Sequence, residues 1–163
     1  MAVKQAITVE PVAHSVRRAI PPWDQIVVAP PPPLVHGDRL TRYEFERRYR
    51  AMPHVKEAEL IEGVVYTPTP VSNRHSQAHG QITTWLGIYC AATPGVHLND
   101  NATVRLDLDN EPQPDALLRL DETLGGRSRI GPDDYIEGAP ELIAEIAASS
   151  ASYDLHDKMN AYR

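Results

Sequence analysis

The sequence predicts an α/β fold in which helices flank a mixed β-sheet, and three segments carry this prediction. Residues 74–92 repeat apolar side chains at helical spacing, residues 103–108 alternate polar and apolar side chains, and residues 141–147 are almost continuously apolar. A period of 3.6 residues indicates a helix and a period of 2 a half-buried strand, while an unbroken apolar run is typical of a strand buried on both faces. Helices and strands that alternate along one chain favour an α/β domain.

The first 37 residues are predicted to be a proline-rich, disordered tail, and residues 38–163 to be the folded domain. Seven of the 15 prolines lie within the first 33 residues, ending in Pro30–Pro33. Proline lacks an amide donor and has a fixed φ, so four in a row favour polyproline II. Two interpretations of these prolines stay open: an extended linker, or a ligand for a proline-recognition domain.

A short helix and a hairpin are predicted to open the domain. Thr41 and Glu44 have the spacing of a capping box, and Met52-Pro53 ends the helix that follows. Residues 58–66 are typical of two strands around a turn at Glu62-Gly63. The helix carries arginines at positions 42, 47, 48 and 50. Two interpretations of these arginines stay open: contact with a DNA backbone, or the solvated face of an amphipathic helix.

The main helix and strands are predicted to follow in order. The helix over 74–92 buries one stripe and ends at Thr93-Pro94-Gly95. A strand at 103–108, a turn, a second strand at 115–120, a loop at 121–140 and the apolar strand at 141–147 come next. Serines 149, 150 and 152 then lead into a last helix over 154–163.

Charge and cysteine content limit the classes of function. The 163 residues carry 16 basic and 22 acidic side chains, a net charge of -6, and residues 51–163 alone carry -9. Because nucleic-acid-binding surfaces are usually basic, a DNA partner has to be inferred from a site rather than from composition. Cys90 is the only cysteine, which excludes a disulfide framework and favours a reducing compartment. No apolar run approaches the ~20 residues of a membrane span. We therefore expect a cytoplasmic protein without a membrane partner.

Glu145 is the anomaly of the sequence, because it lies inside the predicted buried strand. A buried carboxylate costs several kcal/mol unless a partner compensates it. Asp115 begins a neighbouring strand, so both carboxylates are expected at the same end of the sheet, where a divalent cation such as Mg²⁺ or Mn²⁺ could join them. Lys158 lies on the helix that follows. Two acids, a metal and a lysine are the elements of metal-assisted phosphodiester hydrolysis.

These three residues belong to a larger set that resembles a known family. The later part of the set is Gln113-Pro114-Asp115, residues 137–146 with Glu145, Ser149-Ser150, Asp154 and Lys158 through Tyr162. The earlier part is Leu40-Thr41, Glu44-Phe45, residues 58–66, Pro70 and Ser72–His75. Over residues 38–163 the chain resembles the PD-(D/E)XK nuclease superfamily, and within it the bacterial putative restriction endonuclease family of the Uma-two type. The resemblance implies a restriction-endonuclease-like mixed sheet flanked by helices.

The resemblance also implies a site and an activity. Asp115 and Glu145 correspond to the metal ligands, with the main-chain carbonyl of Ile146 as a further ligand. The family's usual lysine position is Ala147 here, so the lysine function is transferred to Lys158. Glu62 and His75 are expected to line the pocket. The expected function is a metal-dependent DNA endonuclease that uses Mg²⁺ or Mn²⁺ and leaves a 5′-phosphate and a 3′-hydroxyl.

One departure from the family keeps a second function open. The implied fold continues past the lysine helix into further strands, so we expect a domain that is truncated at its C-terminus. An exposed sheet edge would favour association with another chain, as in a homo-oligomer. The alternative to a nuclease is therefore a catalytically inactive relative that acts as a nucleic-acid-binding or protein-association module.

Overall fold

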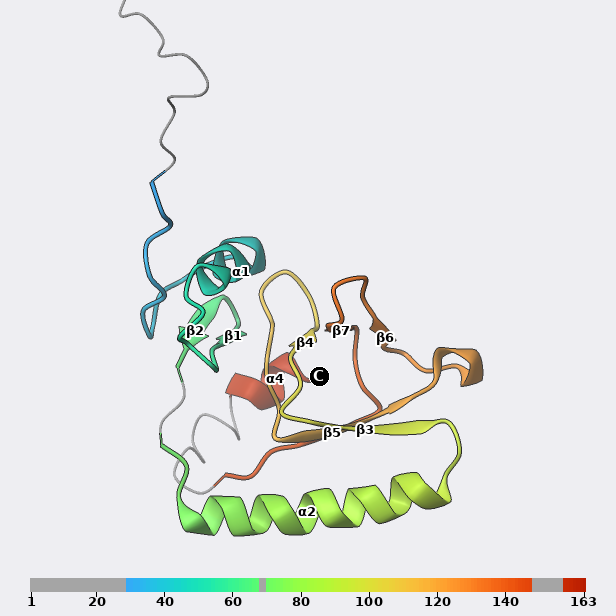
Figure 1. The fold of residues 1–163 in the computed structure, drawn as a ribbon. Coiled ribbons are helices and arrows are strands. Elements are labelled where there is room, and N and C mark those ends of the chain that lie inside the picture. The colour runs from blue at the N-terminus through green and yellow to red at the C-terminus, as the bar shows by residue number, and fades with distance from the viewer. Residues whose placement is uncertain (1–28, 68–69, 148–156) are drawn as a thin grey trace, which may run out of the picture. The chain divides into compact units, whose positions relative to one another are not determined.

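The computed structural model describes residues 29–67, 70–147 and 157–163, and the chain from Pro31 onward forms one unit (Figure 1). The predicted tail up to residue 28, the three serines between 149 and 152 and the start of the last helix at Asp154 lie outside the described residues. Leu34 is buried and packs with Phe45. Contacts with the domain therefore include a residue four positions before the boundary predicted at residue 38, and that boundary stays a prediction.

Helix α1 (Arg42–Arg50) packs on a hairpin formed by β1 (Glu59–Ile61) and β2 (Val64–Tyr66). The capping box predicted at its start does not form. Thr41 is the N-cap residue, but its side chain makes no capping hydrogen bond. Glu44 instead accepts hydrogen bonds from Arg47 and Arg48 one turn further on. The charges of these arginines are thus neutralised within their own helix. Of the two interpretations of the arginines, this supports a solvated helix face over contact with a DNA backbone.

The central sheet has the order β3-β5-β8 and is antiparallel throughout, with β3 (Val96–Asp100), β5 (Ala116–Leu120) and β8 (Leu142–Ala144). Side chains of β5 alternate between its two faces. Ala116 and Leu118 pack on helix α2 (Asn73–Ala92), and Leu117 packs on the opposite side against Val104 and Ile136. The core of this region is therefore split into two layers by one strand.

A second three-stranded sheet covers that opposite face. It has the order β4-β7-β6, with β4 (Val104–Arg105) parallel to β7 (Ile136–Glu137) and β6 (Arg129–Ile130) antiparallel to β7. The short helix η2 (Glu122–Leu124) connects β5 to β6, and α4 (Met159–Ala161) ends the chain. In Figure 1, α2 and α4 lie on opposite sides of β5.

Three sequence predictions need correction. The strand predicted at 103–108 is shortened to Val104–Arg105, because Asp107 accepts hydrogen bonds from the Asn110 side chain and starts a turn. Short strands and η2 occupy part of the predicted loop at 121–140. The strand predicted at 141–147 is not buried on both faces: only 142–144 pair, and Leu142 is 37% exposed.

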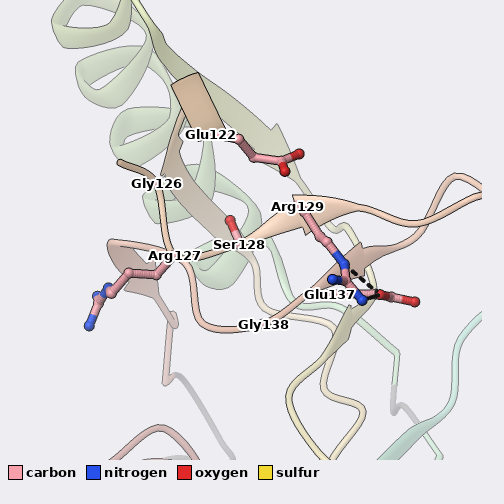
Figure 2. Close-up of a pocket in the computed structure, with 7 residues that line it drawn as sticks. All are labelled: Glu122, Gly126, Arg127, Ser128, Arg129, Glu137 and Gly138. Carbon is pink, nitrogen blue, oxygen red and sulfur yellow. Dashed lines mark hydrogen bonds and ion pairs between the residues drawn. The ribbon is translucent and has the colours of Figure 1, made fainter. Parts of the chain in front are cut away.

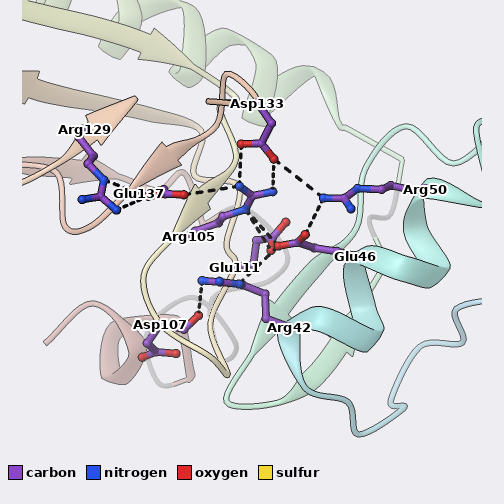
Figure 3. A network of polar contacts seen from close by, with 9 residues as sticks. All are labelled: Arg42, Glu46, Arg50, Arg105, Asp107, Glu111, Arg129, Asp133 and Glu137. Atoms are coloured by element: carbon purple, nitrogen blue, oxygen red, sulfur yellow. Dashed lines mark hydrogen bonds and ion pairs between the residues drawn. The ribbon is translucent and has the colours of Figure 1, made fainter. Parts of the chain in front are cut away.

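Buried charges link α1 to the second sheet (Figure 3). The Arg105 guanidinium donates two hydrogen bonds to Asp133, at 2.9 and 2.8 Å, and lies 3.1 Å from Glu46 on α1. Its face covers the Tyr135 ring, 4.5 Å from the centroid. Glu111 lies in the same cluster and is 3% exposed. One arginine thus joins three segments that are far apart in the sequence.

Among the helices within the described ranges, none has the length and apolar character that a membrane span requires.

Candidate active site

The register of the central sheet places Asp115 and Glu145 beside the same end of the β5–β8 ladder. Ala116 pairs with Ala144 at the end of the β5–β8 ladder. Asp115 precedes the first of these residues and Glu145 follows the second. The two residues predicted from the sequence therefore adjoin the same end of the central sheet, where Asp115 contacts α2 and Glu145 contacts the last helical segment.

Asp115 is fixed from three directions. Its Oδ2 accepts a hydrogen bond from the backbone N–H of Ile146 at 2.6 Å, which ties the start of β5 to the residue after Glu145. Its Oδ1 lies 3.1 Å from Nε2 of His75, in the first turn of α2. One turn further on, Nε2 of His79 lies 2.9 Å from the backbone oxygen of Asp115 and 2.8 Å from the Asp100 carboxylate. This strand terminus is consequently held rigidly against α2.

Glu145 is held by two groups from the last helical segment. Nζ of Lys158 donates to its Oε1 at 3.0 Å, and the Tyr162 hydroxyl donates to the same oxygen at 2.5 Å. Lys158 and Tyr162 are four residues apart, so they lie on one face of a helix. Both contacts fall on Oε1, so Oε2 is the oxygen of Glu145 that a cation could approach.

Lys158 also contacts Glu59, a residue that sequence reasoning did not select. Oε1 of Glu59 lies 2.9 Å from Nζ of Lys158 and accepts a hydrogen bond from the backbone N–H of Gln113 at 2.7 Å. Lys158 is 5% exposed. A nearly buried ammonium thus bridges two carboxylates, one from the hairpin and one from the central sheet.

Burial and neighbouring charges raise the pKa values of both Glu145 and Lys158. Burial raises the pKa of Glu145 to about 7, although the neighbouring Lys158 ammonium favours the ionised form. Burial acts against the charge of Lys158, but the carboxylates of Glu59 and Glu145 outweigh it, so the pKa of Lys158 lies above its ordinary value. Glu145 therefore lies in an environment that a bound cation would compensate.

The structure brings together most of the predicted residues but separates one of them. Asp115, Glu145 and Ile146 meet at the sheet end, with Lys158 on Glu145 and His75 on Asp115. Glu62 instead occupies the turn of the β1–β2 hairpin with φ 49°, where its backbone N–H donates to Asn110. Its negative charge still contributes, behind burial and Asp157, to raising the pKa of Tyr66.

Two signals in the sequence point to the residues that were missed. A turn at Glu62-Gly63 forces Glu62 to the tip of the hairpin, so Glu59, at the open end, was the acid able to reach another element. Tyr162 follows Lys158 by one helical turn, which predicts a shared helix face. His79 follows His75 at the same spacing. We find no sequence signal for its contact with Asp100.

A separate open pocket lies around β6 and does not include these residues (Figure 2). It is lined by Glu122, Gly126, Arg127, Ser128, Arg129, Glu137 and Gly138. Arg129 is paired with Glu137 across it, with hydrogen bonds of 2.7 and 3.0 Å to one carboxylate oxygen. The acids and bases of this pocket balance each other, so it offers no excess charge of either sign.

The mixed α/β architecture, with two carboxylates at one end of its central antiparallel sheet, defines a restriction-endonuclease-like fold. Comparison with family models agrees with this class. Residues 42–163 match the model of the Uma2 family, described as "Putative restriction endonuclease", and the chain belongs to this family. No curated protein matches the chain in a sequence search.

Proposed function

We propose that the chain is a metal-dependent endodeoxyribonuclease that hydrolyses phosphodiester bonds with Mg²⁺ or Mn²⁺. The observation that carries this proposal is that Asp115 and Glu145 adjoin Ala116 and Ala144, the last pair of the β5–β8 ladder, with Lys158 bound to Glu145 at 3.0 Å. Membership of a restriction endonuclease family supports the reaction class and DNA as the substrate.

The donor atoms at this position fit a hard divalent cation. Asp115, Oε2 of Glu145 and the main-chain carbonyl of Ile146 are all oxygen donors, which Mg²⁺ and Mn²⁺ prefer. The ion would also compensate the burial that raises the pKa of Glu145 to about 7. When bound, such a cation supplies Lewis acidity toward phosphoryl oxygens and activates water.

The residues of this chain have distinct roles in the proposed reaction. The Ile146 N–H and His75 orient the Asp115 carboxylate, so this ligand is positioned before substrate binds. Lys158 orients the attacking water or offsets the negative charge that develops on the phosphate. Glu59 and Tyr162 act as positioning residues, because Glu59 holds the Lys158 ammonium and Tyr162 holds Oε1 of Glu145.

A plasmid-nicking assay with Mg²⁺ or Mn²⁺ tests this function. We expect Asp115→Asn and Glu145→Gln each to lower the nicking rate roughly hundredfold or more, because each removes a metal ligand. Glu57→Gln is the matched control, since Glu57 is an exposed acid two residues from Glu59. The proposal is wrong if folded wild-type protein gives no metal-dependent nicking, and a non-catalytic binding module would then be the better interpretation. Cleavage that persists unchanged in both site variants would refute the assignment of the site.

A further inference from the structure

The stripe of α2 that faces the central sheet changes from apolar to polar toward the start of the helix. Ile82 and Leu86 pack against the sheet, and Figure 1 shows α2 beside β3 and β5. His75 and His79 continue the same stripe, because positions three or four residues apart lie on one face of a helix. A helix that packs on a sheet ordinarily uses apolar residues along this stripe, so the two histidines require a separate reason.

Both histidines contact one residue, Asp115. Nε2 of His75 lies 3.1 Å from the Asp115 carboxylate, and Nε2 of His79 lies 2.9 Å from the backbone oxygen of Asp115. The backbone N–H of Asn101 donates to that same oxygen at 3.2 Å. His75 thus holds the side chain of Asp115, whereas His79 and Asn101 hold its main chain.

The neighbours of His79 determine which of its ring nitrogens carries the proton. A carbonyl oxygen can only accept a hydrogen bond, so Nε2 of His79 donates toward Asp115. The Asp100 carboxylate lies 2.8 Å from the same nitrogen and favours the tautomer with the proton at Nε2. The side chain of Asp100 is 53% exposed and that of His79 is 21% exposed. This pair therefore extends from the solvent to the main chain of Asp115.

The main-chain contact acts where the strand is least secured by sheet pairing. The last pair of the β5–β8 ladder joins Ala116 to Ala144, so Asp115 lies just beyond it. Positions at the ends of strands open locally more readily than interior positions. Loss of the imidazole donor would let this end of β5 fray. The Asp115 carboxylate would then have to be ordered when a cation binds, which costs conformational entropy.

We propose that His79 and Asp100 are positioning residues that set the affinity of Asp115 for the divalent cation. This inference rests on the metal site of the proposed function. Neither residue is a proposed ligand, because His79 acts on the main chain of Asp115 and Asp100 acts through His79. Removing a partner of this kind typically weakens metal binding about tenfold to hundredfold.

Binding of Mn²⁺ tests this role in the absence of DNA, with electron paramagnetic resonance measuring the unbound ion. We expect His79→Leu to weaken Mn²⁺ binding about tenfold or more, and Asp100→Asn to weaken it in the same direction. His79→Gln should retain most of the affinity, because its side-chain amide can donate from the position of Nε2. His97→Leu is the matched control and should bind Mn²⁺ as wild type does. His97 lies 3.6 Å from Asp121, toward the other end of β3.

Further outcomes separate a positioning role from a merely structural one. The nicking rate of His79→Leu should recover at saturating Mn²⁺, because the proposed ligands and Lys158 are unchanged. The inference is overturned if this rate stays low, if His79→Leu binds Mn²⁺ as tightly as wild type, or if His79→Gln fails to restore binding. Equal weakening in His97→Leu would overturn it as well. If urea denaturation shows that His79→Leu does not fold, the exposed Asp100→Asn variant decides, and an unchanged affinity there overturns the inference.

Failure of this inference is distinguishable from failure of the proposed function. Asp115→Asn should abolish the binding that His79→Leu weakens, and binding that persists would overturn both the site and the inference. A protein that binds Mn²⁺ in the expected pattern but does not nick DNA would contradict only the proposed activity. A protein that nicks DNA with Mn²⁺, yet binds the ion equally well in His79→Leu, would overturn only the inference.

Discussion

Lys158 shows that one buried side chain can connect separate parts of the candidate site. Its ammonium is nearly buried, and a buried charge is tolerated only when opposite charges compensate it. Glu59 and Glu145 provide that compensation at 2.9 and 3.0 Å. The two acids belong to different sheets, so this one side chain joins the β1–β2 hairpin to the central sheet.

Replacing Glu59 by glutamine should therefore destabilise the fold. The change removes a carboxylate that contacts Lys158 and weakens the acceptor for the Gln113 N–H. We expect the free energy of unfolding, measured by urea denaturation, to fall by roughly 1–3 kcal/mol. The exposed Glu57→Gln variant should stay within about 0.5 kcal/mol of wild type. Equal stability of the two variants would show that Glu59 does not compensate the buried lysine.

Glu111 makes stability depend on pH. Burial, together with the adjacent Glu46 carboxylate, raises the pKa of Glu111 to about 8, against the influence of Arg105 and Arg42. The folded state therefore holds a proton on Glu111 that the unfolded state releases above its ordinary pKa of 4.5. Stability from this group is fully present below about pH 4.5 and is lost as pH rises to about 8.

The variant Glu111→Gln should remove this dependence, because the amide is neutral at every pH and similar in shape to the protonated acid. We expect its unfolding free energy to exceed that of wild type at pH 9 and the difference to shrink as pH falls toward 5. Urea denaturation at a series of pH values measures both. A difference that grows toward low pH would have the wrong sign for a buried, protonated carboxyl.

At the scale of elements, the hairpin depends on a turn that only a few residue types can form. Gly63 has φ 72°, and a Cβ there would lie 3.3 Å from the backbone oxygen of Leu40. Gly63→Ala should cost about 1–2 kcal/mol in unfolding free energy because alanine disfavours the left-handed region. Gly63→Asn should cost less, since asparagine visits that region more readily. If alanine were tolerated as well as asparagine in denaturation experiments, backbone conformation would not be what selects glycine here.

Elements with strong local signals were predictable, and those made by tertiary pairing were not. The spacing of apolar residues predicted the bounds of α2 to within one residue, and Glu62-Gly63 predicted the position of the hairpin turn. Strand β3 was missed, because Val96–Asp100 mixes apolar with polar residues and owes its place to pairing with β5. Strands β6 and β7 are two residues each, too short to show a period.

In the candidate site too, residues with a local sequence signal were predictable, and those placed by tertiary packing were not. That Asp115 and Glu145 adjoin one end of the sheet was predictable, because both follow from the predicted strands next to them. The premise that Glu145 lies inside a buried strand was wrong, because β8 ends at Ala144, and the observed partners of Glu145 are Lys158 and Tyr162. Glu59 was not found, because the hairpin turn shows only that Glu59 lies at the open end. Its contact with Lys158 depends on how the hairpin packs against the last helical segment. The hairpin acid chosen from the sequence, Glu62, is three residues away and lies in the turn.

At the scale of the whole molecule, the distribution of charge determines how DNA could bind. Residues 51–163 carry -9, and the α1 arginines at positions 47, 48 and 50 are paired with acids of their own helix. The protein therefore presents an unfavourable field to a phosphate backbone. A cation held by Asp115 and Glu145 would reverse the local sign at the proposed site, where a phosphate would approach.

DNA affinity should accordingly depend on divalent cations. We expect fluorescence anisotropy with a labelled duplex to give a dissociation constant at least about tenfold lower in Ca²⁺, a hard cation that prefers oxygen ligands, than in EDTA. Asp115→Asn should abolish the difference, whereas Glu57→Gln should retain it. Because few basic residues contribute, the dependence of affinity on monovalent salt should be shallow, corresponding to few released counterions. Tight, strongly salt-dependent binding in EDTA would indicate a basic surface elsewhere and would separate DNA binding from the carboxylate site.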